Sequence, residues 1–151
     1  MNRLERMKNW GGIIMVGFFS FFLGCAADYP VSGVASMPSC DCQTIVQTAQ
    51  KTMADLGYSV LQSDPDKGLL SVQKEFGDIV KTMSFHVGNE KDKGVRMLME
   101  LDTSEVMAPP PARFTRIELV NITKVLAKQM GFSENDVFMQ FGKEQKPLSS
   151  Y

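Results

Sequence analysis

Residues 79–102, IVKTMSFHVGNEKDKGVRMLMELD, decide the fold. Apolar side chains alternate with mostly polar ones on both sides of the charged stretch GNEKDKG, as at Met83 and Phe85 before it and at Met97 and Met99 after it. Successive side chains of a β-strand point to opposite faces, so this alternation predicts two strands that each bury one face. The charged stretch is bounded by glycines and predicts a turn, so the two strands are expected to pair in antiparallel fashion.

A second pair of strands is expected immediately before this one. Residues 58–62 and 69–76 flank the segment SDPDKG, residues 63–68, whose proline near the start and glycine at the end are typical of a turn. Together the two pairs predict an antiparallel meander of about four strands, with one buried face and one largely polar face.

Amphipathic helices are expected before and after this sheet. The first covers residues 42–56, is capped by Ser39 or Asp41 and ends at Gly57. The second covers residues 114–130, after three consecutive prolines. The apolar positions that define the buried helix faces are Ile45, Ala49, Met53 and Leu56 in the first, and Ile117, Val120, Ile122, Val125, Leu126 and Met130 in the second.

These elements predict an α+β fold, a two-layer sandwich in which the antiparallel meander carries both helices on one face, in the order α-β-β-β-β-α. The domain is expected to span residues 41–142, followed by a polar tail at 143–151. Residues 133–142 leave two options. They can start a short helix with a strand-like exit, or form an edge strand through Val137 and Met139.

The chain before the domain divides into a leader, residues 1–24, and a flexible tether, residues 25–40. The tether has no apolar period and contains Pro30, Gly33 and Pro38. Its composition therefore predicts a mobile linker.

The leader has the layout of an export signal. Arg3, Arg6 and Lys8 precede an apolar run, WGGIIMVGFFSFFLG, at residues 10–24. This run is shorter than the roughly 20 apolar residues that a membrane-spanning helix needs. The leader therefore predicts that the protein is exported to the cell envelope.

Phe22-Leu23-Gly24-Cys25, at the end of the leader, resembles the lipobox of bacterial lipoproteins. The resemblance implies that Cys25 is acylated, for example with palmitate, and that signal peptidase II cleaves between Gly24 and Cys25. It implies a domain held by lipid at the bilayer and facing the periplasm, since several acyl chains bind a membrane stably. Ala26 resembles the context that sends enteric lipoproteins to the outer rather than the inner membrane. The alternatives are a plain leader and an uncleaved anchor in which Cys25 is an ordinary thiol.

Cys40 and Cys42 remain as a pair once Cys25 carries lipid. In an oxidising compartment we expect them to form a disulfide, either across Asp41 or between two chains. A helix N-terminus lowers a thiol pKa, so a thiol-redox role is an alternative. A metal site that also includes His86, the only histidine, is another. The sequence spacing does not bring His86 to the cysteines, and strand alternation places it on the polar sheet face.

Composition argues against several classes of function. The chain has 16 basic and 17 acidic residues and a formal net charge of −1, without a basic cluster, which disfavours nucleic-acid binding. It contains no glycine-rich phosphate loop, nucleophile elbow or metalloprotease motif, and no cofactor is implied. Methionines are numerous enough to suggest a copper site, but Met53, Met83, Met97, Met99 and Met130 fall on the faces expected to form the core, so core packing is the stronger explanation.

We therefore expect a non-enzymatic binding or scaffolding module that contacts another component of the envelope. The contact surface is expected to be the polar sheet face or an open strand edge. A thiol-redox or metal-binding periplasmic protein centred on Cys40 and Cys42 is the alternative. The residues expected on the polar face are Ser71, Gln73, Thr82, Ser84, His86 and Arg96.

Overall fold

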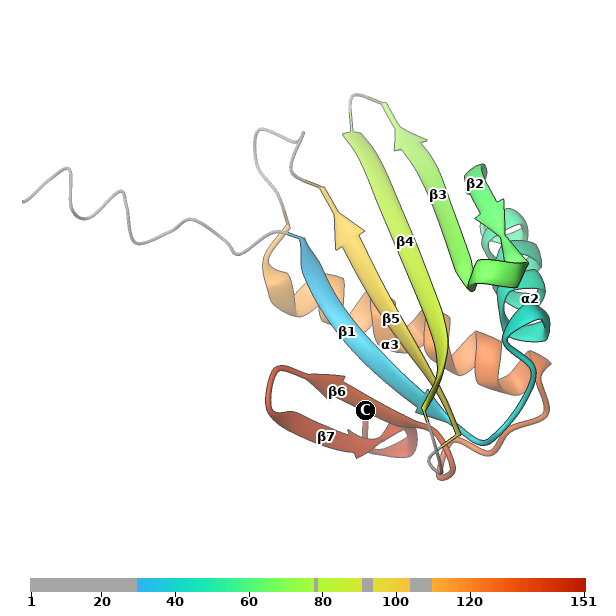
Figure 1. The fold of residues 1–151 in the computed structure, drawn as a ribbon. Helices are drawn as coiled ribbons and strands as arrows, with labels where there is room; N and C mark the ends of the chain where they lie inside the picture. Colours follow the sequence, from blue (N-terminus) through green and yellow to red (C-terminus); the bar gives the residue numbers. More distant parts are fainter. Residues whose placement is uncertain (1–29, 78, 91–93, 104–109) are drawn as a thin grey trace, which may run out of the picture.

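Seven antiparallel strands form one sheet in the computed structural model, in the order β2-β3-β4-β5-β1-β6-β7 (Figure 1). The structure describes residues 30–77, 79–90, 94–103 and 110–151. The predicted signal peptide, with Cys25 and the cleavage site, lies outside these residues. In the described part of the chain, neither helix is long and apolar enough to cross a bilayer. The predicted α+β class is confirmed.

The two strands at the centre of the sequence pattern are β4 (Ile79–Glu90) and β5 (Gly94–Asp102). Phe85 of β4 lies opposite Met99 of β5, and Met97 shares the same sheet face. All three side chains are completely buried. The alternation of the sequence therefore identifies the buried face correctly.

A hairpin precedes them, as predicted, and consists of β2 (Ser59–Asp64), the 3-10 turn η2 (Pro65–Lys67) and β3 (Leu69–Phe76). Gly68 closes the turn with a φ of +69°, which favours glycine. A Cβ at this position would lie 2.0 Å from the carbonyl oxygen of Val87. The turn therefore requires glycine for both its backbone angle and its packing.

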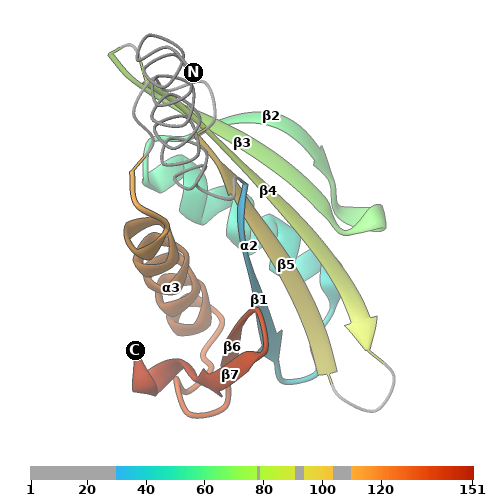
Figure 2. The same ribbon diagram turned by 90° about the vertical axis from the view of Figure 1, so that its left-hand side faces the viewer.

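The two helices, α2 (Cys42–Asp55) and α3 (Ala112–Gln129), lie on the same side of the sheet (Figure 2). Asp41 caps α2, because its carboxylate accepts a hydrogen bond of 3.2 Å from the backbone N–H of Thr44. The side chains that the helices bury include Ile45, Val46, Ala49 and Met53 of α2 and Leu119, Ile122 and Leu126 of α3.

A strand replaces much of the tether that was expected at residues 25–40. β1 (Val31–Met37) lies between β5 and β6 and pairs with β5 over its whole length. Ala35 is completely buried, and Gly33 packs so closely that a Cβ there would lie 2.7 Å from the ring of Phe141. The prediction of a flexible tether is wrong for these seven residues, because every second one of them packs into the core and Gly33 allows a close approach to Phe141.

The C-terminal residues are also folded. β6 (Phe138–Phe141) pairs with β1, and β7 (Glu144–Pro147) pairs with β6 to form the far edge of the sheet. The short turn η3 (Leu148–Ser150) follows, and its Leu148 is completely buried. The expected polar tail at 143–151 is therefore wrong. The strand option for the segment before it is confirmed, and no helix forms there, but β6 lies between β1 and β7 and is not the edge strand that was expected.

The folded domain is thus longer at both ends than the predicted span of 41–142. β1 extends it at the N-terminal side, and β6, β7 and η3 extend it at the C-terminal side. The sheet has seven strands instead of about four, since all three additional strands lie outside the predicted meander.

Candidate functional site

The sheet face opposite the helices carries no helix in the described part of the chain (Figure 2). Its side chains alternate with the core positions of β3, β4 and β5. They include Ser71, Thr82 and Ser84, which are short and polar, and His86 and Arg96, which are exposed. This open face is the polar face that the sequence predicts.

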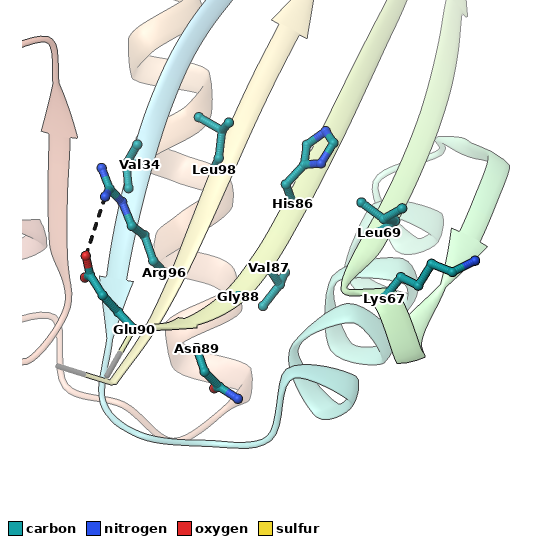
Figure 3. Close-up of a pocket in the computed structure, with 10 residues that line it drawn as sticks. All are labelled: Val34, Lys67, Leu69, His86, Val87, Gly88, Asn89, Glu90, Arg96 and Leu98. Carbon is teal, nitrogen blue, oxygen red and sulfur yellow. Dashed lines mark ion pairs between the residues drawn. The ribbon is translucent and has the colours of Figure 1, made fainter. Parts of the chain in front are cut away.

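A shallow hollow of about 440 Å³ lies on the open face. His86 occupies the middle of its lining, between its register neighbours Leu69 of β3 and Leu98 of β5 (Figure 3). At the rim, Nη1 of Arg96 lies 3.6 Å from Oε1 of Glu90. Both side chains of this ion pair are nearly half exposed, so it contributes at most about 1 kcal/mol to stability. Its effect is to hold the guanidinium group beside the hollow.

The hollow is better equipped for binding than for proton transfer. The imidazole of His86 makes no hydrogen bond or ion pair with any other described residue. A histidine that acts as a general base is normally oriented by a second group bonded to its other ring nitrogen. His86 can exchange a hydrogen bond with a ligand, Arg96 can bind a carboxylate, and the leucines supply apolar contact.

Cys40 and Cys42 flank Asp41, the residue that caps α2. Both thiols are free and partly buried, and Sγ of Cys42 lies 3.4 Å from Oδ1 of Asn89. Burial raises the pKa of the Cys40 thiol, and the negative charges of Cys42 and Asp41 raise it further. A redox-active thiol needs the opposite shift. The thiol-redox alternative therefore gains no support here, and the disulfide stays a prediction.

The three candidate metal ligands do not form a cluster. Cys40 and Cys42 lie at the start of α2, whereas His86 lies on the open face of β4. Across the described ranges, no group of three His, Cys, Asp or Glu side chains is placed to hold a metal ion. The metal-binding alternative is therefore not supported by this geometry.

A second hollow, of about 330 Å³, lies between the end of α2, the β2–β3 hairpin and α3. Tyr58, at its floor, donates a hydrogen bond of 3.0 Å to Oε1 of Glu118. Nζ of Lys81 donates one of 2.9 Å to Oε2 of the same carboxylate. Burial raises the pKa of Tyr58, and the charge of Glu118 and its hydrogen bond raise it further.

The rim of this second hollow is apolar and exposed. Phe76, Phe114 and Ile117 are 45 %, 51 % and 55 % exposed. The sequence places Ile117 on the packed face of its helix, and that prediction is wrong. One feature of the sequence indicates this exposure. The apolar face of the helix is broader than the stripe that a helix buries when it packs on a sheet with one side.

Comparison with known proteins assigns no family. No protein-family model matches the chain, and no curated protein matches it. The function is therefore inferred from the residues and their geometry.

Proposed function

We propose that this chain is a bacterial envelope lipoprotein whose folded domain binds another envelope component and catalyses no reaction. Acylated Cys25 would hold it on a membrane, the outer membrane by the context of Ala26, with the domain in the periplasm. The anchor rests on the leader sequence alone. The binding role rests on one observation above others. The sheet face that carries the hollow around His86 is covered by neither of the two described helices (Figures 2 and 3).

The chemistry of the open face suits a non-obligate protein partner. Leu69 and Leu98 provide apolar contact beside His86, while Ser71 and Ser84 provide hydrogen-bonding groups. Interfaces of proteins that associate and separate mix apolar and polar surface in this way. A broad sheet face also fits the roughly 800 Å² that each partner buries in a typical complex.

The edge of the sheet offers a second mode of contact. β2 is an outer strand, and its Val60 and Leu61 are 41 % and 56 % exposed. An edge strand has unpaired backbone groups, to which a strand of the partner can add. The open face is the primary surface in this proposal, because it carries the hollow.

Site-specific crosslinking in cells tests the binding role. A photoreactive amino acid replaces Ser84 or His86 on the open face, and Lys128 on the outer surface of α3 as the matched control. We expect one defined adduct from the open-face positions and none from the control. The same adducts from both surfaces, or none from either, contradict the proposal.

Metabolic labelling with palmitate and intact mass measurement test the anchor separately. We expect label on the wild-type protein and none on the Cys25→Ala variant. A native protein with an unmodified Cys25 thiol and an attached leader refutes the anchor.

A further inference from the structure

Only six residue steps separate Cys25 from the sheet, because β1 begins at Val31. An extended chain gains about 3.3–3.6 Å per residue, so these steps span at most about 20–22 Å. If Cys25 is acylated, as proposed above, the start of β1 lies within this distance of the bilayer. A flexible tether over all of residues 25–40 would allow a much larger distance between the sheet and the bilayer.

The end of the sheet where β1 begins also carries the β3–β4 hairpin (Figure 1). Val31 is level with Leu101 of β5, which is level with Met83 of β4. Ile79 pairs with Phe76 at the tip of the hairpin and lies four residues before Met83. At about 3.3 Å per residue, the tip projects about 13 Å beyond the start of β1.

Exposed apolar side chains gather at this end of the domain. Phe76 and Ile79 are 45 % and 38 % exposed, Phe114 and Ile117 near the start of α3 are 51 % and 55 % exposed, and Leu56 after α2 is 40 % exposed. All but Ile79 line the hollow of about 330 Å³. These five residues form the end patch. Clustered exposed apolar residues, unlike scattered ones, mark interaction surfaces.

Basic side chains border the end patch. Nζ of Lys74 lies 4.7 Å from the centre of the Phe76 ring, and the guanidinium carbon of Arg113 lies 4.8 Å from that of Phe114. Lysine and arginine at a lipid surface pack their apolar stems against the protein while their charged ends reach the phosphates.

Nζ of Lys74 also donates a hydrogen bond to the backbone carbonyl of Leu56, so Arg113 is the side chain better placed to bind a headgroup phosphate. Asp55 and Glu75 are exposed beside the patch, so its border carries both signs of charge.

We propose that the end patch rests in the surface of the bilayer that holds Cys25. The short chain before β1 keeps this end of the domain beside the membrane, and contact with lipid removes Phe76, Ile79 and Phe114 from water. The occupant is the lipid surface, because the tether brings the patch within reach of it. The protein then has two membrane contacts, the acyl chains and the end patch.

Tryptophan fluorescence tests this proposal on the mature, lipidated protein. Trp10 is the only tryptophan and belongs to the leader that cleavage removes. Phe114→Trp therefore gives the mature protein a single reporter in the end patch. Phe138→Trp is the matched control, because Phe138 is 39 % exposed and pairs with Ser36 near the other end of β1. Both variants are reconstituted in vesicles of phosphatidylethanolamine and phosphatidylglycerol with brominated acyl chains, which quench tryptophan on contact.

We expect the tryptophan at position 114 to lose most of its emission in brominated vesicles relative to unbrominated ones, and the tryptophan at position 138 to keep its emission. No quenching at either position, or equal quenching at both, overturns the proposal. Intact mass of the same samples separates the two ideas. An acylated Cys25 without quenching refutes the end patch and leaves the anchor standing, whereas an unmodified Cys25 refutes both.

Discussion

Met37→Ala tests whether residues 31–37 are a strand or a tether. Met37 is 2 % exposed and pairs with Val95 of β5, so its side chain is part of the core. Truncating a buried methionine to alanine costs about 2–5 kcal/mol through lost burial and the cavity left behind. A domain of this kind is stable by about 5–15 kcal/mol in total, so the loss is large. We expect the melting temperature to fall by about 6–20 °C.

Urea unfolding followed by circular dichroism measures the free energy of unfolding of this variant. Ser36→Ala is the matched control, because Ser36 belongs to the same strand and its side chain lies on the open face. The control should stay within about 0.5 kcal/mol of the wild type. If Met37→Ala changes stability no more than the control does, residues 31–37 are not a core strand and the short tether is refuted.

Tyr58→Phe should reduce the loss of stability at alkaline pH. Burial and Glu118 raise the pKa of Tyr58 in the folded state, so the contribution of Tyr58 to the free energy of unfolding is complete below pH about 10. That contribution is lost as the pH rises above this value, because the unfolded chain loses the proton first. Urea unfolding of both proteins gives the free energy of unfolding as a function of pH, and equal slopes for the two proteins contradict the prediction. Ile117→Glu should leave the free energy of unfolding within about 0.5 kcal/mol of the wild type, since the side chain is 55 % exposed. The same substitution should weaken the quenching of the tryptophan at position 114 by brominated lipid. Unchanged quenching argues against lipid contact at this residue. In protein purified from the envelope, Cys40 and Cys42 should react with a thiol reagent only after reduction; two reactive thiols per chain without reductant disprove the disulfide, and electrophoresis without reductant distinguishes a bridge within one chain from one between chains.

Strands β4 and β5 could be predicted because their two faces differ sharply. Met83 and Phe85 alternate with Thr82 and Ser84, so burial on one side is visible in the local sequence. The alternation also places His86 correctly on the open face. A local alternation of apolar and polar residues is sufficient to predict a strand and its buried face wherever one face is packed and the other is exposed to solvent.

β1 could not be predicted in this way. Its Ser32, Gly33 and Ser36 have the composition of a linker, and the buried face of the strand is formed by small residues such as Ala35 as well as by Met37. Its pairing with β5 joins segments that are far apart in the sequence. Strand preference depends on such neighbours more than on the residues themselves.

The end patch could not be predicted either. Leu56, Phe76 and Phe114 belong to three separate parts of the chain, and only the tertiary structure brings them to one hollow. Ile117 fits the apolar period of its helix, but its side chain is 55 % exposed in the folded domain. Periodicity identifies an apolar face and does not say how much of that face another element covers.

Ile79 of the end patch and His86 of the hollow belong to the same strand, β4, and their separation limits the height of the binding surface above the membrane. His86 is seven residues beyond Ile79 in β4, which corresponds to about 23 Å. If the hairpin tip touches lipid, the hollow lies no more than about this distance above the membrane surface. A flexible tether over residues 25–40 would have left that height open. The partner is therefore expected to be a protein of the same membrane. Crosslinks from Ser84 to such a protein agree with this geometry, whereas crosslinks only to proteins of the opposite membrane contradict it.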